Sequence, residues 1–339
     1  MDPLKVLHIN DVSNVASNLV KGQRALGLDA EIFKISKGTA LRKGLSRAFL
    51  PVNKIRDAYR LKKYINANNF DVIHVHFATH AWMAQLAGVR YFLHIHGSDV
   101  RSYLYRPVLK QMIVSAIKNA IKVFYVTPEL KIHLQSIRPD AIFLPNPINT
   151  DVFKPNGKGF SSSGQILCIS KLDRYKGVEN FLKTIELVWE TRPDVTVGMF
   201  NFGNMVELAE PFLTKYKNDS RLRLISRLPY DQMPALNGAY EIVLGHQDPE
   251  YGSLSCSELE SMACEKPVVV QFLYPDAYPE PPPVSVSKTP EEACNKIIQL
   301  LDNPGQAASL GMAAREWVRK YHEQGLITKR LVDYYREAV

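Results

Sequence analysis

Residues 248–270, DPEYGSLSCSELESMACEKPVVV, combine a small-residue loop with the start of a short helix. The first N–H groups of a helix have no partner within it, and together with the helix dipole they favour an anion. Glu260 follows about one turn into this helix, where a carboxylate could accept hydrogen bonds from hydroxyl groups. The sequence therefore predicts a site for a phosphate that carries a hydroxyl-rich ring. The loop residues expected to meet the phosphate are Gly252, Ser253, Leu254 and Ser255.

Two lysines lie in the turn KLDRYKG, between a predicted strand and a predicted helix. Lys171 and Lys176 could neutralise a diphosphate and the charge that it gains as a leaving group. A solvated pair on a surface turn is the alternative for these lysines. Taken together with the loop at residues 252–255, they favour the diphosphate interpretation.

Two further glutamates lie close to Glu260. Glu250 belongs to the loop and could hydrogen-bond a sugar, and the sequence leaves this assignment open. Glu258 lies two positions from Glu260 and therefore on another face of the helix. For Glu258 we expect a solvated carboxylate in the first turn, where the helix dipole favours negative charge.

Histidines gather at the ends of two predicted strands in the first half of the chain. His96 ends an apolar strand and precedes Gly97, which permits a tight turn there. The pairs His74/His76 and His94/His96 each place two imidazoles on one face of a strand, which is also a metal-site geometry. No Cys or carboxylate ligand set accompanies them, so we expect no metal. The candidates for a cleft in this half of the chain are Asn14, His76, Gly97, Ser98 and Asp99.

The net charge of +8 comes from one segment of the 339-residue chain. Residues 34–63 hold ten Lys or Arg, with Asp57 as the one acid, and apolar residues lie between them. Such a basic amphipathic surface suits an anionic membrane. A solvated pair of helices separated at Pro51 is the alternative. We expect no nucleic acid as partner, because no recognition motif accompanies the charge.

Other bulk features restrict the class of protein. No apolar run reaches the length of a membrane-spanning helix. The chain enters a predicted strand within a few residues of its start, which leaves no room for a signal peptide. The four cysteines fall at no metal or redox spacing and are expected to be reduced. These features predict a cytoplasmic protein, peripheral on the inner face of the membrane if the basic segment binds lipid.

Predicted strands and helices alternate over residues 4–144 and again over residues 165–301. This alternation predicts parallel sheets with right-handed crossovers. The stretches PNP and KPNGKGFSSSG form the composition break between the two halves. The predicted fold is α/β, with two Rossmann-like, doubly wound domains, residues 1–148 and 149–321, facing each other across a cleft. In such sheets ligands bind beyond the carboxyl ends of the strands, where the polar candidates gather.

Several catalytic motifs are absent from the sequence. No G-x-G-x-x-G follows the first predicted strand, and no G-x-x-x-x-G-K-[ST] occurs. These absences argue against a conventional dinucleotide-binding fold and against a P-loop NTPase. A G-x-S-x-G nucleophile elbow is also absent.

Several segments resemble, in order, motifs of the glycosyltransferase group 1 family, which are retaining, nucleotide-sugar-dependent enzymes of the GT-B fold. ELESMACEKPVV resembles the family's LEAMACGKPVI signature, and SKLDRYKGVENFLKTIELV resembles its GRL…KGVD phosphate-binding turn. LPYDQMPALNGAYEIVL resembles its VPYEEMPALYAAADVFVL run, and NPINTDVFKP resembles the NGVDTDVFKP linker. FDVIHVH and HIHGSDV resemble its DVVHAHG and HGSD elements. The resemblance covers essentially the whole chain.

The resemblance implies roles for individual residues. Lys171 and Lys176 would hold the donor diphosphate, and Glu260 would bind the ribose. The loop at residues 253–255 would supply backbone amides, and His96 would lie near the transferred sugar.

The resemblance also implies an activity and a domain plan. The donor would be a nucleotide-diphosphate sugar, such as a UDP- or GDP-sugar, and transfer would retain the anomeric configuration. Residues 1–148 would bind the acceptor, joined by a last helix at residues 322–339, and residues 149–321 would bind the donor. Such enzymes generally use neither a metal nor a protein nucleophile, and the leaving diphosphate is proposed to assist a front-side displacement.

The chain departs from the family pattern at three places. The family has two glutamates eight positions apart, and the partner of Glu260 would be Gly252, so Glu250 is the candidate replacement. A register that pairs Glu250 with Glu258 would shift the E-S-M-A run out of alignment. The glycine-rich turn after the first strand is replaced by SNVAS at residues 13–17. Glu265 stands where the family has a glycine, and we expect it in a left-handed conformation.

Together these observations predict a glycosyltransferase acting on a sugar or lipid-linked acceptor. Two alternatives stay open from sequence. One is a nucleotide-sugar epimerase of the same fold. The other is a non-catalytic sugar-nucleotide-binding protein, which the missing glutamate at position 252 would favour.

Overall fold

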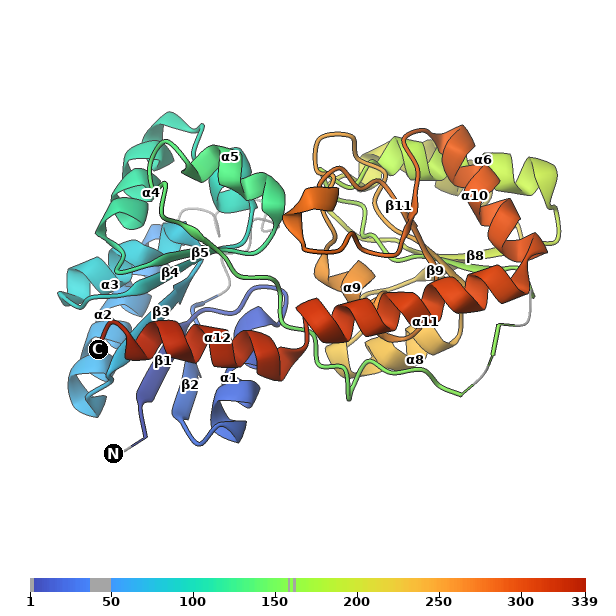
Figure 1. Ribbon diagram of the computed structural model, residues 1–339. Helices are drawn as coiled ribbons and strands as arrows, with labels where there is room; N and C mark the ends of the chain where they lie inside the picture. The colour runs from blue at the N-terminus through green and yellow to red at the C-terminus, as the bar shows by residue number, and fades with distance from the viewer. Residues whose placement is uncertain (1–2, 37–49, 158, 161–162) are drawn as a thin grey trace. The chain divides into compact units, whose positions relative to one another are not determined.

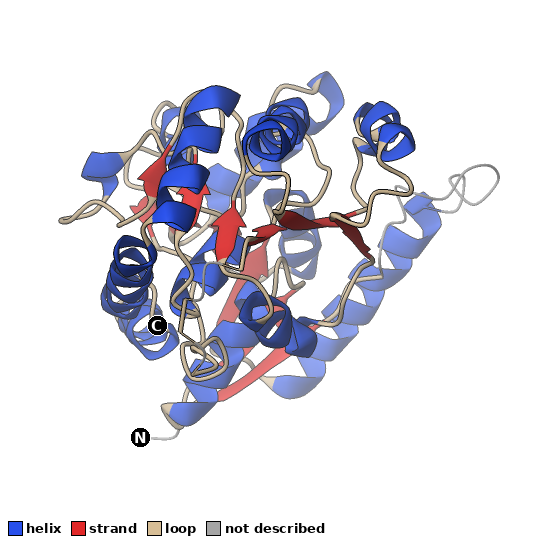
Figure 2. Ribbon diagram, turned by 90° about the vertical axis from the view of Figure 1, so that its right-hand side faces the viewer, coloured by secondary structure: helices blue, strands red, loops and turns tan. Residues whose placement is uncertain are grey.

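The computed structural model describes residues 3–36, 50–157, 159–160 and 163–339. The chain divides into two compact units. Unit 1 comprises Met1–Pro147 and Gln324–Val339, and unit 2 comprises Ile148–Glu323. Each unit holds one six-stranded parallel sheet with helices on both faces (Figures 1 and 2), as the predicted α/β fold requires.

The sheet of unit 1 has the strand order β2-β1-β3-β4-β5-β6. Its strands are short, mostly buried apolar runs, as expected when helices cover both faces of a parallel sheet. The strands are β1 (Lys5–Ile9), β2 (Asp29–Phe33), β3 (Val72–His76), β4 (Phe92–Ile95), β5 (Val123–Tyr125) and β6 (Ile142–Phe143). The helices are α1 (Val15–Ala25), α2 (Leu50–Asn68), α3 (Ala81–Ala87), α4 (Pro107–Asn119), α5 (Lys131–Leu134) and α12 (Gln324–Arg336).

The last helix, α12, completes unit 1 although it is far from the rest of that unit in sequence (Figure 1). It packs against α1, where a Cβ on Gly22 would overlap the Thr328 side chain. Gln324 Nε2 donates to the Asn18 carbonyl at 2.6 Å, and Tyr335 is fully buried. These contacts make α12 part of the core of unit 1.

The sheet of unit 2 has the strand order β12-β11-β10-β7-β8-β9. The strands are β7 (Gln165–Cys168), β8 (Thr196–Phe200), β9 (Leu222–Ile225), β10 (Ile242–Leu244), β11 (Val268–Val270) and β12 (Ser285–Val286). The helices are α6 (Val178–Thr191), α7 (Glu210–Lys215), α8 (Met233–Gly238), α9 (Cys256–Ala263), α10 (Pro290–Asp302) and α11 (Pro304–Tyr321).

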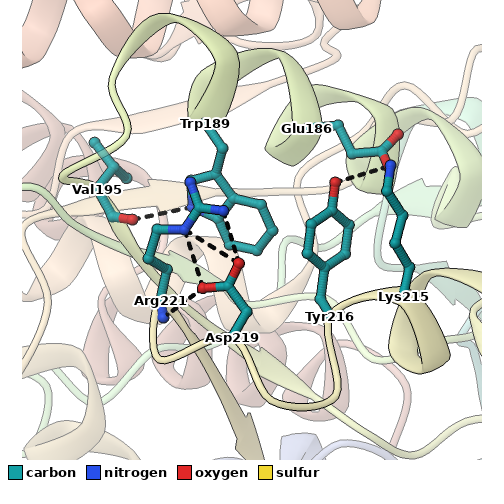
Figure 3. Close-up of polar contacts among 7 residues, drawn as sticks. All are labelled: Glu186, Trp189, Val195, Lys215, Tyr216, Asp219 and Arg221. Atoms are coloured by element: carbon teal, nitrogen blue, oxygen red, sulfur yellow. Dashed lines mark hydrogen bonds and ion pairs between the residues drawn. The ribbon is translucent and has the colours of Figure 1, made fainter.

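A polar cluster joins α6 to the turn before β9 (Figure 3). Arg221 Nη2 lies 2.6 Å from Asp219 Oδ2, and its guanidinium lies 4.7 Å over the Trp189 ring. Trp189 Nε1 donates to the Val195 carbonyl at 3.0 Å.

One expectation about the elements was wrong, and one strand was not predicted. We expected a break between helices at Pro51, but α2 begins at Leu50 and runs through it. Proline is tolerated in the first turn of a helix because its missing N–H has no intrahelical partner there. The first of the two expected helices falls in residues 37–49, outside the described residues. The sequence also gave no sign of β12, which pairs with β11 after a proline-rich loop.

No helix in the described ranges is long and apolar enough to cross a membrane.

Candidate active site

The donor-side candidates of unit 2 follow two adjacent strands, β7 and β10. The chain adds β8 and β9 on one side of β7 and then continues with β10 on its other side. Such a switch point opens a crevice at the carboxyl ends of the strands. Residues 171–177 follow β7 and residues 246–255 follow β10, so both candidate loops meet there.

Close backbone approach joins these two loops. Gly177 has φ +63°, and a Cβ at this position would overlap the Gln247 carbonyl. Gln247 N donates to the Lys176 carbonyl at 3.1 Å, and Asn180 Nδ2 donates to the Gln247 carbonyl at 2.9 Å. Lys176 is thereby held beside the second loop, with its Nζ 4.7 Å from the centroid of the Tyr251 ring.

Lys171 lies in a different environment from Lys176. Its Nζ forms a 2.6 Å ion pair with Asp173 Oδ2, and half of the side chain is exposed. Asp173 Oδ1 also accepts from the Asn204 N–H at 2.7 Å, which fixes the carboxylate in the turn. The structure thus places Lys176 against the loop at residues 251–255 and pairs Lys171 within its own turn.

Hydrogen bonds from the protein shape the loop before α9. The His246 ring Nε2 bonds to the Ser253 carbonyl at 2.7 Å. Ser255 and Glu258 form a capping box, in which Ser255 N donates to Glu258 Oε2 at 2.6 Å. The capping box uses the N–H groups of residues 255 and 258, so those of residues 256 and 257 are the donors at this helix end that a ligand would meet.

The expectation that Glu258 is solvated was wrong. The loop at residues 246–255 folds over the first turn of α9, and Glu258 is fully buried. Its Oε1 accepts from the His246 N–H at 2.8 Å. Burial raises the pKa of Glu258, but His246, Lys176 and the backbone donors outweigh it and hold the pKa below the usual range. Glu258 therefore builds the loop and is not a free ligand group.

Glu260 is the second buried carboxyl of α9. It is 5% exposed, and the Tyr230 hydroxyl donates to its Oε1 at 3.0 Å. Burial raises the pKa of Glu260 to about 8, and the Tyr230 hydrogen bond opposes this shift. A carboxyl with such a pKa can gain or lose its proton near neutral pH when a polar ligand binds.

Position 252 cannot simply carry a glutamate in this loop. Gly252 has φ +58°, and a Cβ there would lie 2.6 Å from Leu273 Cγ. The Gly252 carbonyl also accepts from Leu273 N at 2.9 Å, so the loop is fixed against this residue. Glu250 is exposed, and its N–H donates to Asp248 Oδ1 at 2.9 Å.

The prediction for the end of α9 is confirmed. Glu265 has φ +59°, in the left-handed region where glycine is favoured.

In unit 1 the loop after β4 is organised by Asp99. Its buried carboxylate accepts from the backbone N–H groups of Gly97, Ala78 and His96, at 2.8, 3.2 and 3.3 Å. Burial raises the pKa of Asp99, and these backbone donors oppose the shift. Asp99 thus holds the loop together, whereas Ser98 is exposed.

His76 and His96 bond to each other beneath this loop. His76 is fully buried, His96 is partly exposed, and His76 Nδ1 lies 2.9 Å from His96 Nε2. The metal alternative considered from the sequence corresponds to two histidine groups whose ligand atoms lie within 4.8 Å of one another. Their members are His8, His74 and His76 in one group and His76, His94 and His96 in the other.

In the turn after β1, the carboxylate of Asp11 accepts hydrogen bonds from the first residues of α1. Asp11 Oδ1 accepts from the Ala16 N–H at 3.0 Å, and Asp11 Oδ2 accepts from the Ser17 hydroxyl at 2.5 Å. Asn14 has φ +60° and makes no side-chain cap to α1. A carboxylate therefore occupies the helix end where the family has its glycine-rich turn.

Sequence reasoning missed several residues that build these sites. Tyr230 lies within the LPYDQMPAL segment used for the resemblance, but nothing in that pattern indicates its bond to Glu260. His246 and Tyr251 flank the predicted loop without a distinguishing spacing. His8 lies within the apolar run of β1, and only the strand pairing shows that it lies opposite His74.

Comparison with known proteins assigns the chain to a class. A model of the Glycosyltransferase Family 4 domain matches residues 12–152, and a Glycosyl transferase-like model matches residues 182–332. The two matches, which together span most of both units, identify the chain as a glycosyltransferase. No curated protein sequence matches it.

Solved structures similar to this chain have the GT-B fold. Sucrose-phosphate synthase from Thermosynechococcus elongatus superposes with a TM-score of 0.76 and 15% identity, covering 98% of each chain. HepE from Anabaena in complex with UDP-glucose superposes with a TM-score of 0.75 and 14% identity, covering 98% of this chain and 100% of HepE. A glycosyltransferase from Rickettsia africae superposes with a TM-score of 0.73 and 17% identity, covering 100% of this chain and 99% of its own. The protein is thus a glycosyltransferase with the two-domain GT-B fold.

Proposed function

We propose that this glycosyltransferase takes its sugar from a nucleotide-diphosphate donor held by the loops after β7 and β10. The observation that carries the proposal is the position of Lys176 against the loop that begins α9, with Glu260 one turn further along that helix. A cation, unpaired helix N–H groups and a buried carboxyl suit a diphosphate followed by a ribose. UDP-glucose is the first donor to test, because HepE was solved with it.

The chemistry that we propose needs no protein nucleophile. Lys176 and the first N–H groups of α9 would stabilise the negative charge that develops on the leaving diphosphate. We propose transfer with retention by front-side attack, without a metal, with the cationic groups of the protein stabilising the diphosphate. Lys171 would assist after exchanging Asp173 for the phosphate, because its own side chain is half exposed.

We further propose a lipid-linked acceptor at the cytoplasmic face of a membrane. The face of α2 supports this idea, since Ile55 and Tyr59 are 65% and 72% exposed one turn apart. Exposed basic residues surround them, namely Arg56, Arg60, Lys62 and Lys63. The acid of this segment, Asp57, is buried and accepts from Ser36, so the exposed face is positive. Apolar side chains among basic ones suit an anionic lipid surface.

The test compares Lys176→Ala with Arg174→Ala, which removes an exposed positive charge from the same turn. Both variants and the wild type are screened against UDP- and GDP-sugars by thermal shift, because a bound donor stabilises the fold by mass action. We expect Lys176→Ala to lose the stabilisation by UDP-glucose or another donor, and to lose its turnover at least 100-fold. Arg174→Ala should remain close to wild type. Equal turnover in the two variants would contradict the diphosphate site.

The same assay separates the alternatives. Release of nucleotide and transfer of the sugar to an acceptor, with a product of the same anomeric configuration, support retaining transfer. Epimerised sugar from donor alone would instead indicate an epimerase. Tight donor binding without turnover on any acceptor would indicate a binding protein.

A further inference from the structure

Five histidines lie in contact on one face of the unit 1 sheet. The strand register brings them together, since His8 of β1 lies opposite His74 of β3, and His76 of β3 lies opposite His94 of β4. His96 follows directly after β4 on the same face, and its ring centroid lies 4.8 Å from that of His94. Four of the rings are fully buried, and His96 at the carboxyl edge is partly exposed.

Hydrogen bonds connect three of these rings into a chain that ends on α1. His96 Nε2 lies 2.9 Å from His76 Nδ1, and His76 Nε2 lies 2.8 Å from His8 Nδ1. His8 Nε2 then lies 2.9 Å from Oε1 of Gln23, which is itself fully buried. The chain therefore runs from the edge of the sheet to its interior.

The rings of this chain are neutral at pH 7. Burial lowers the pKa of His8 to about 4 and that of His96 to about 3. The pKa of His76 is lowered well below 6.5, first by burial and then by the neighbouring histidines. A neutral imidazole has one N–H donor and one acceptor nitrogen. The direction of each hydrogen bond in the chain therefore fixes the direction of the next one.

The amide of Gln23 gives the chain its direction. Its Oε1 can only accept, so His8 Nε2 donates to it and His8 Nδ1 accepts. It follows that His76 donates through Nε2 and accepts through Nδ1, and that His96 donates through Nε2. Gln23 Nε2 has no hydrogen-bond partner among the described residues, so the direction of the chain rests on the contact between His8 Nε2 and Gln23 Oε1.

We propose that the chain Gln23–His8–His76–His96 positions the His96 ring so that its Nδ1 accepts a hydrogen bond from a ligand hydroxyl. Within the described residues His96 Nδ1 has no hydrogen-bond partner, and it carries a lone pair. A sugar hydroxyl can donate to that lone pair, whereas an ionised phosphate oxygen cannot. Gln23, His8 and His76 are thus positioning residues. The inference rests on the proposed function, because the resemblance to the glycosyltransferase group 1 family implies that His96 lies near the transferred sugar.

A metal ion is the competing occupant of this cluster. Tetrahedral Zn²⁺ at about 2.0–2.1 Å from each nitrogen would hold those nitrogens roughly 3.3 Å apart. The chain has 2.8 and 2.9 Å between ring nitrogens, which is the spacing of hydrogen bonds between neutral rings. His76 belongs to both histidine groups with metal-like spacing, and its two nitrogens are already bonded to His8 and His96.

The test reads the tautomer of His96 directly, by long-range proton–nitrogen NMR of ¹⁵N-histidine-labelled full-length protein. Gln23→Glu keeps an acceptor at the end of the chain, and Gln23→Lys replaces it with a donor at the same buried position. We expect wild type and Gln23→Glu to show His96 protonated on Nε2. Gln23→Lys should protonate Nδ1 instead and lower kcat/KM for sugar transfer about tenfold or more.

A second pair of variants covers the case in which Gln23→Lys fails to fold. His76→Phe interrupts the chain, whereas His94→Phe removes an equally buried ring that stacks on His76 and His96 but makes no bond in the chain. We expect a measurable Nδ1–H population of His96 in His76→Phe and none in His94→Phe.

Three results would overturn the proposal. They are a wild-type His96 protonated on Nδ1, a tautomer that His76→Phe leaves unchanged, and one equivalent of Zn²⁺ that shifts the resonances of these histidines. If the tautomers respond as expected but no nucleotide sugar is turned over, the positioning chain stands and the proposed function fails.

Discussion

Replacing Glu260 with glutamine should make unit 2 more stable at alkaline pH and should weaken the binding of the donor. Burial raises the pKa of Glu260 to about 8, against about 4.5 in the unfolded chain. The folded state therefore binds this proton more tightly than the unfolded state does. The corresponding stability is fully present below pH 4.5 and is lost as the pH rises towards 8.

The size of this effect follows from the shift. At 1.36 kcal/mol per pKa unit, moving the pKa from 4.5 to about 8 is on the order of 5 kcal/mol. Glutamine has the same shape and no charge to bury, so Glu260→Gln should avoid this loss. At pH 5 the two proteins should differ by less than about 1 kcal/mol, and at pH 9 the variant should be more stable by a few kcal/mol.

Urea unfolding at pH 5 and pH 9 measures this difference through the fluorescence of Trp189 and Trp317, both in unit 2. Glu250→Gln is the matched control, because it removes an exposed carboxylate close by in sequence. Parallel pH dependence of wild type and Glu260→Gln would refute the buried, protonated carboxyl. In the wild type, donor binding near pH 7 should release a proton, which titration calorimetry in buffers of different ionisation enthalpy detects. Glu260→Gln should release none and bind about 10–100-fold more weakly, because charge-assisted hydrogen bonds are lost.

Two further predictions concern other parts of the chain. Glu265→Gly should raise the free energy of unfolding by about 0.5–1 kcal/mol in urea titrations, because glycine adopts φ +59° without strain; a loss of stability would show that the Glu265 side chain outweighs its backbone strain. Neutralising Arg56, Lys62 and Lys63 to glutamine should weaken binding to anionic liposomes at least tenfold, at about 1 kcal/mol per basic residue. The same change at Lys183, Lys217 and Lys288, which are exposed on unit 2, should have little effect. Equal sedimentation of the two variants would argue against a membrane role for α2.

Much of the fold could be predicted from the sequence because its buried strands are apolar runs between turn signals. The helix at Pro107–Asn119 and the strand at Thr196–Phe200 follow directly from such runs. The edge strand Ser285–Val286 could not be predicted, because two residues after a proline-rich loop carry no periodicity. Its pairing depends on β11, which is a tertiary contact.

The candidate site was predictable in residue type and less so in environment. Helix periodicity placed Glu258 and Glu260 on different faces, but it could not show that both carboxyls would be buried. The left-handed conformation of Glu265 was predictable from the expected end of the helix. The histidine chain was not, since its distances depend on the register of three strands that are far apart in sequence.

The place of α12 has a consequence for how the protein is made. Unit 1 consists of the first 147 residues and the segment after residue 323, with all of unit 2 inserted between them. On the ribosome, unit 2 can therefore be completed before α12, whose Ile327, Leu331 and Tyr335 are buried in unit 1, has been made. Until α12 has been synthesised, the surfaces that it contacts on α1 and at His74 remain uncovered. Unit 1 thus begins first but is completed only by α12, and a chain cut before α12 would contain all of unit 2 and an incomplete unit 1.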